Sequence, residues 1–141
     1  MRSVFFLFSF FLFTSAFSQN EKIKVFINCR CDDDFLKQNT LFFDYVRDRT
    51  LSDIEIFVFE ITNASGGRNY SFNYNGKNDF LNKQNEINVT VPQNISLNKA
   101  RIILLDTYKL GMASFLSNTH YQSYIDVSFD KEITTSDPNN T

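Results

Sequence analysis

Two cysteines, a run of three aspartates and a single histidine are the side chains best suited to chemistry in this sequence. Cys29 and Cys31 form a C-x-C pair that could close a disulfide, remain as free thiols or supply half of a metal site. A metal site needs further ligands, but the sequence has no other cysteine and only one histidine, His120. We therefore expect neither a bound metal nor a cofactor.

The aspartates at positions 32, 33 and 34 stand where a helix should begin. One of them can accept hydrogen bonds from free backbone N–H groups, and the others favour the positive end of the helix dipole. A cation site is the rival interpretation, although three adjacent carboxylates do not all point the same way. His120 lies in neither a Ser-His-Asp nor a Cys-His pattern, so no catalytic residue is predicted.

Arg47-Asp48-Arg49 is the densest charged cluster. It is predicted to close a helix, and residues two apart on a helix diverge by roughly 200°. Arg47 should then point to solvent, while Arg49 bonds helix-end carbonyls or a carboxylate such as Asp44 or Asp53. The alternatives are that the cluster is simply a solvated helix end, or that it binds a partner.

The first 18 residues have the features of a secretory signal peptide. Arg2 provides the positive charge, an apolar run covers residues 4–13, and small residues at Ala16 and Ser18 suit a cut before Gln19. The alternative is an uncut membrane anchor, but the apolar run is well short of the ~20 residues that span a bilayer. Export would carry both cysteines into an oxidising compartment.

The rest of the chain is predicted to form one α/β or α+β domain over residues 19–133, followed by a polar tail at 134–141. Apolar periodicity predicts strands at residues 22–28, 53–62, 70–75 and 86–91. It predicts helices at residues 35–49 and from an N-cap at Ser96 to about residue 115, with a last strand at 124–129. The order is β-α-β-β-β-α plus a terminal strand, in a mixed sheet with helices packed on it. The first two strands should be parallel and the following ones antiparallel.

The strand at residues 53–62 is apolar on both sides, so we expect it to be central and covered on both faces. Gly66 and Gly67 then indicate a hairpin turn, because a phosphate-binding loop would also need a lysine and a following helix. Gly111, inside the long helix, indicates close packing. Sequons for N-glycosylation begin at four asparagines, Asn63, Asn69, Asn88 and Asn94.

Several of these motifs together resemble a family of exported, uncharacterised proteins of the Gram-negative envelope. The resemblance runs from about residue 24 to residue 115 and rests on F-D-Y-V-R-D-R at 43–49, D-I-E-I at 53–56, S-G-G-R-N-Y at 65–70 and Y-K-L-G at 108–111. The family-motif residues are Tyr45, Val46, Arg47, Asp48, Arg49, Gly66 and Gly67. The resemblance implies an envelope location and no known activity.

Two features depart from that family. The cysteines are spaced differently from those of relatives, and residues 137–140 match only the start of a D-P-W-N-x-W-like segment, without its tryptophans. Longer members continue from that segment into a region that resembles an outer-membrane β-barrel. This chain is accordingly either a naturally short member or a truncated one.

The function expected from the sequence is that of an exported, non-enzymatic, periplasmic or cell-envelope domain with a binding or structural role. Its partner would be an envelope protein or a cell-wall component, and no transmembrane helix should remain after signal removal. A net charge of −2 argues against nucleic acid. The alternatives are a secreted hydrolase that uses residues 32–34 in a cleft, and a secreted glycoprotein if the source is eukaryotic.

Overall fold

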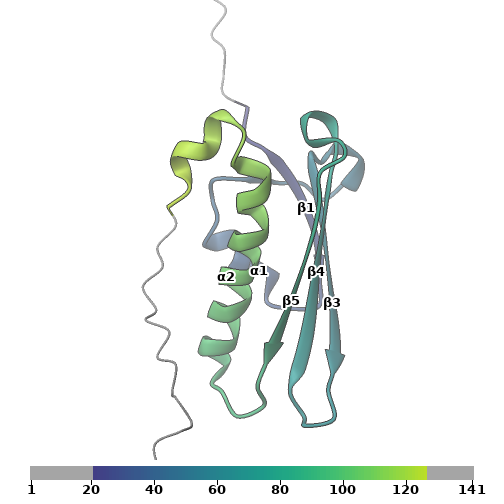
Figure 1. The fold of residues 1–141 in the computed structure, drawn as a ribbon, viewed down its shortest axis with the longest axis vertical. Helices are drawn as coiled ribbons and strands as arrows, with labels where there is room; N and C mark the ends of the chain where they lie inside the picture. Colours follow the sequence, from purple (N-terminus) through teal and green to yellow (C-terminus); the bar gives the residue numbers. More distant parts are fainter. Residues whose placement is uncertain (1–20, 127–141) are drawn as a thin grey trace, which may run out of the picture.

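A computed structural model describes residues 21–126 of the chain. The domain has two layers, a five-stranded mixed sheet and a long helix that crosses one of its faces (Figure 1). The predicted signal peptide and the polar tail lie outside the described residues, as does the second half of the predicted last strand. The predicted α/β class and mixed sheet are confirmed.

The sheet has the strand order β2-β1-β3-β4-β5. Strands β1 and β3 are parallel, and β3, β4 and β5 form an antiparallel meander, as predicted. The short strand β2, which was not predicted, pairs parallel to β1 at the edge of the sheet. The strand bounds are β1 Lys24–Cys29, β2 Asp44–Tyr45, β3 Ile54–Thr62, β4 Arg68–Gly76 and β5 Gln84–Val91.

The remaining elements are two α-helices and three short 3₁₀ turns. The helices are α1 Asp33–Gln38 and α2 Leu97–Leu116, and the turns are η1 Arg49–Leu51, η2 Asn78–Phe80 and η3 His120–Tyr124. Ser96 caps α2 by accepting a hydrogen bond from the Lys99 N–H at 3.2 Å. Asp32 caps α1 in the same way through the Phe35 N–H at 3.1 Å, so both predicted helix starts are confirmed.

The core lies between α2 and one face of the sheet. Alternate residues of β3 and β4 point into it, because successive side chains of a strand point to opposite faces. They meet one side of α2, and the buried set includes Val25, Ile54, Ile56, Phe72, Tyr74, Tyr108, Met112 and Phe115. In β4, the alternation of apolar residues therefore predicted the inner face correctly.

Gly111 is the point of closest approach between helix and sheet. A Cβ at this position would overlap the Tyr74 ring, whose hydroxyl donates to the backbone carbonyls of Thr107 and Tyr108 at 3.2 and 3.3 Å. The close packing predicted for Gly111 is confirmed, and its cause is the large ring that β4 places beneath it.

The helix predicted for residues 35–49 is wrong beyond Gln38. Asn39 and Thr40 turn their side chains back onto the chain and bond the Phe35 and Leu36 carbonyls at 2.8 and 2.6 Å. Such side-chain bonds compete with helix continuation. The chain then extends, so that Asp44 and Tyr45 pair with β1.

Two other predictions on the sheet differ from the structure, the first of them only over the residues that are described. The described part of the predicted last strand forms no strand, because Tyr124 closes η3 and residues 125–126 have no regular structure. Strand β3 is central, but α2 covers only its inner face. The outer face carries Phe57, Phe59 and Ile61, and the latter two are 58% and 68% exposed.

Candidate functional site

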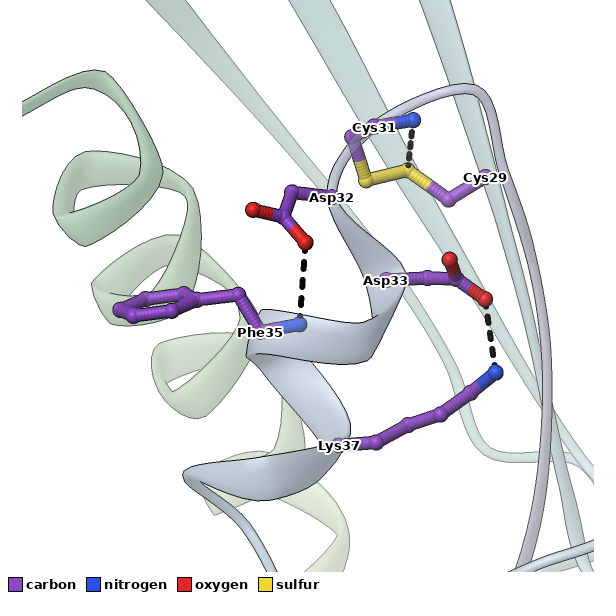
Figure 2. The surroundings of a disulfide bond; sticks show 6 residues. All are labelled: Cys29, Cys31, Asp32, Asp33, Phe35 and Lys37. Atoms are coloured by element: carbon purple, nitrogen blue, oxygen red, sulfur yellow. Dashed lines mark hydrogen bonds and ion pairs between the residues drawn. A yellow bond between two sulfur atoms is a disulfide. The ribbon is translucent and has the colours of Figure 1, made fainter. Parts of the chain in front are cut away.

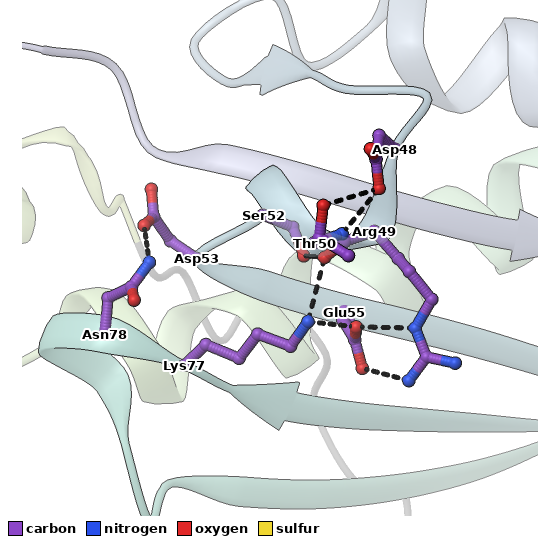
Figure 3. Close-up of polar contacts among 8 residues, drawn as sticks. All are labelled: Asp48, Arg49, Thr50, Ser52, Asp53, Glu55, Lys77 and Asn78. Atoms are coloured by element: carbon purple, nitrogen blue, oxygen red, sulfur yellow. Dashed lines mark hydrogen bonds and ion pairs between the residues drawn. The ribbon is translucent and has the colours of Figure 1, made fainter.

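The outer face of the sheet holds a buried carboxylate between two cations (Figure 3). Glu55 of β3 is only 4% exposed, and it accepts hydrogen bonds from Arg49 Nε at 3.0 Å and from the Arg49 terminal nitrogen at 3.3 Å. Lys77, in the turn after β4, forms an ion pair with the same carboxylate and donates to the Arg49 carbonyl at 2.8 Å. Arg49 therefore bonds Glu55, and not Asp44 or Asp53, the carboxylates that the sequence suggested as partners.

Burial of Glu55 opposes ionisation, but the hydrogen bonds from Lys77 and Arg49 more than offset it. The pKa of the Glu55 carboxyl is consequently held below its ordinary value. The Arg49 guanidinium also lies over the Phe57 ring, 5.6 Å from its centroid. The cluster stays charged at neutral pH and fixes the start of β3 to the turn after β4.

The other residues of the Y-V-R-D-R motif are separated by the fold. Asp48 caps η1 by accepting from the Thr50 N–H at 2.9 Å and its hydroxyl at 2.7 Å, and these two bonds lower the pKa of Asp48. Val46 donates its N–H to the Val25 carbonyl at 3.0 Å. Arg47 is exposed, as predicted. The motif thus shapes a turn, and its members do not converge on one site.

Tyr45 points to the helix layer and joins a chain of hydroxyls. Thr40 donates to the Leu36 carbonyl at 2.6 Å, so it accepts from the Tyr45 hydroxyl at 2.5 Å, and Tyr45 in turn accepts from Tyr108 at 2.8 Å. Burial raises the pKa of both tyrosines. These hydroxyls are satisfied inside the fold and hold β2 against α2.

Gly66 and Gly67 lie in the β3–β4 hairpin turn, at the opposite end of β3 from Arg49. Gly66 has a φ of +80°, which favours glycine, and Asn63 Oδ1 accepts from the Gly67 N–H at 2.8 Å. The two family motifs are therefore not brought together. The hairpin turn lies instead beside Arg30, Cys31 and other residues that line one cavity.

Cys29 and Cys31 are joined in a disulfide at the junction of β1 and α1 (Figure 2). The Cys31 N–H also donates to Cys29 Sγ at 3.0 Å. Of the aspartates that follow, Asp32 caps α1 and Asp33 pairs with Lys37 at 2.6 Å. The acidic run thus starts the helix, and within residues 21–126 no cluster of three potential metal ligands forms.

His120 opens η3 at the surface, and its ring lies tilted against that of the next residue, Tyr121, with ring centroids 3.8 Å apart. A groove of about 700 Å³ runs nearby between α2 and the residues that follow it. Phe42, Met112 and Leu116 line it, and Asp106 and Lys109 stand among the polar residues of its wall.

The outer sheet face divides into an apolar half and a polar half. Strands β1 and β3 contribute Phe26, Phe57, Phe59 and Ile61, and the Phe26 and Phe57 rings lie 6.1 Å apart. Strands β4 and β5 contribute short polar side chains, among them Asn69, Ser71, Asn73, Glu86, Asn88 and Thr90. We call the row formed by half-buried Phe57 and exposed Phe59 and Ile61 the outer apolar row.

The polar half of this face is internally bonded. The Thr90 hydroxyl donates to the side-chain oxygen Oδ1 of Asn69 at 3.0 Å, and the Asn88 side-chain amide donates to the Glu86 carboxylate at 3.1 Å. A shallow hollow of about 320 Å³ lies between this half and the outer apolar row, lined by Phe59, Ile61 and residues of both polar strands. The sequence showed the apolar residues but not that they would stay uncovered.

The chain matches no family model, no curated protein and no solved structure. Among residues 21–126, no helix combines the length and the apolar character that a membrane crossing requires.

Proposed function

We propose that the protein is an exported, non-enzymatic domain of the cell envelope that binds a partner protein through the outer face of its sheet. The observation that carries the proposal is the exposure of Phe59 and Ile61 on the central strand, at 58% and 68%. An exposed apolar patch rimmed by polar side chains is typical of a protein-binding surface.

The composition of this face favours a protein over a glycan. A sugar is held by stacking on rings and by free donors and acceptors, whereas Ile61 has no ring and the rim side chains Asn69, Glu86 and Asn88 already bond within the face. The outer apolar row is uncharged. The matching partner therefore presents an apolar, largely uncharged surface, and burial of that surface supplies most of the binding energy.

The proposal of export rests on the N-terminal sequence and is supported by the Cys29–Cys31 disulfide, since disulfides persist in oxidising compartments. The mass of the protein isolated from its native compartment tests it. We expect an N-terminus at Gln19, and an intact Met1 in a membrane fraction would contradict the cut.

The same mass spectrum tests the glycoprotein alternative. Asn69 and Asn88 lie on the outer face, so a glycan on either would cover the proposed binding surface. Asn63 is less available, because its side-chain oxygen accepts from the Ser65 hydroxyl at 2.8 Å and from the Gly67 N–H. An unmodified mass is expected, and a glycan at Asn69 or Asn88 would overturn the proposal.

Photo-crosslinking tests the binding surface. A photoreactive residue at position 71, on the outer face, should yield a protein adduct of one defined mass in the native envelope. The partner identified from that adduct is then purified, and its affinity is measured for the parent, for Phe59→Ser/Ile61→Ser, and for the control Leu81→Ser/Leu110→Ser, which removes two exposed leucines elsewhere.

We expect the outer-face variant to weaken binding at least about tenfold and the control to leave it unchanged. An equal effect of both variants, or an adduct that forms only with glycan strands, would overturn the proposal. An adduct at twice the monomer mass would identify the partner protein as a second copy of the chain.

A further inference from the structure

A cavity of about 440 Å³ lies at the end of the domain that contains the disulfide. Three arginines from separate elements line it. Arg30 stands between the bonded cysteines, Arg68 begins β4, and Arg101 lies near the start of α2. The hairpin glycine Gly66 lines the same cavity. The fold thus gathers into one place cations that are far apart in the sequence.

These guanidinium groups are poorly paired within residues 21–126. Arg101 approaches Asp32 Oδ2 only to 3.6 Å, and Arg68 approaches Glu60 Oε1 only to 3.6 Å. Arg30 forms no ion pair among the described residues. The Arg101 Nε atom is buried without an acceptor, although its guanidinium lies 4.9 Å from the centroid of the Phe35 ring. A buried donor left without an acceptor is costly, so the residues around Arg101 do not fully satisfy its guanidinium group.

The charge around the cavity is positive although the whole chain has a net charge of −2. Against the three arginines, Asp32 is the single carboxylate in the lining, and it already caps α1 through Phe35. Leu97 and Ala100, from the first turn of the 20-residue helix α2, complete the wall. The positive end of the helix dipole adds to the field of the arginines.

We propose that this cavity binds one oxyanion, a phosphate or carboxylate group. Arginine is suited to this task because its planar, forked donors match the oxygens of both groups. The cavity lies on the helix side of the sheet, away from the outer apolar row. The inference therefore stands independently of the proposed protein partner.

Calorimetric titration at constant ionic strength tests the proposal, with inorganic phosphate and with acetate as probes. The test variant is Arg30→Gln/Arg68→Gln, which removes two cavity charges and leaves Arg101 packed on Phe35. The control, Arg47→Gln/Lys109→Gln, removes two exposed charges outside the cavity. Circular dichroism confirms that both variants are folded.

We expect the parent to bind, the test variant to lose at least about tenfold in affinity and the control to stay within about twofold. Tighter binding of phosphate would point to a phosphate-bearing ligand, tighter binding of acetate would point to a carboxylate, and equal binding would support a general oxyanion site. Failure of the parent to bind either anion, or equal losses in both variants, would overturn the proposal.

Discussion

Replacement of Gly111 by alanine tests the packing between α2 and the sheet. In an exposed helix this change stabilises by about 1 kcal/mol, because glycine is the poorer helix former. Here the added Cβ would overlap the Tyr74 ring, which is held by two carbonyls of α2 and is 1% exposed. The ring has no free space to enter, so the helix must shift or the Tyr74 hydrogen bonds must break.

The expected loss of stability is the cost of overpacking the core minus the gain in helix propensity. Overpacking a core costs about 1–3 kcal/mol, and the overlap with several ring atoms places Gly111→Ala at the upper end of that range. After subtraction of the helix-propensity gain, we expect a net destabilisation of about 2 kcal/mol. For a domain of this size that corresponds to a fall of about 10 °C in melting temperature.

A second background separates steric overlap from any other cause. Tyr74→Leu removes the ring and is itself destabilising, but in that background Gly111→Ala should stabilise by about 1 kcal/mol. The difference between the two effects is a coupling free energy of about 3 kcal/mol. It is measured by urea unfolding of the parent, the two single variants and the double variant. If Gly111→Ala has the same effect in both backgrounds, Tyr74 is not the obstacle and the reasoning is refuted.

Three further predictions follow from the sheet. Ile56→Ala should lower the free energy of unfolding by about 2–5 kcal/mol, because Ile56 is fully buried. Phe57→Ala, on the half-buried outer side, should lower it by less. Equal losses of stability in urea unfolding would mean that the outer face is covered. Arg49→Ala should lower the free energy of unfolding by only about 1 kcal/mol, because water screens an ion pair whose arginine side chain is 60% exposed. Arg47→Ala should lower it by less than about 0.5 kcal/mol. Equal melting temperatures for the two variants would contradict the Arg49–Glu55 contact. Because the pKa of Glu55 is lower in the folded protein than its ordinary value of 4.5, its contribution to stability is present above pH 4.5 and is lost as the pH falls through the folded pKa. Glu55→Gln should therefore lose less stability than the parent as the pH falls below 4.5. If the stability of the two proteins falls in parallel with pH, ionised Glu55 does not stabilise the fold.

Local patterns were sufficient to predict much of the architecture. Alternation marked β1, β3, β4 and β5, and the residues that cap α1 and α2 were recognisable because capping involves only a few neighbouring backbone groups. The same spacing rule failed for residues 39–49, where Phe42 and Val46 fit a helical stripe. Hydrogen bonds from Asn39 and Thr40 end the helix there, and pairing of Asp44 and Tyr45 with β1 replaces it.

The sequence by itself determined which residues are apolar, where strands alternate, and that two cysteines lie close enough to join. Only the tertiary structure decided that one face of β3 stays open, because coverage depends on how many helices reach the sheet. It also decided that Glu55 lies between Arg49 and Lys77, and that Arg30, Arg68 and Arg101 share one cavity. Apart from the Arg49–Glu55 pair, these contacts join residues distant in sequence, and no local periodicity encodes which distant charges meet.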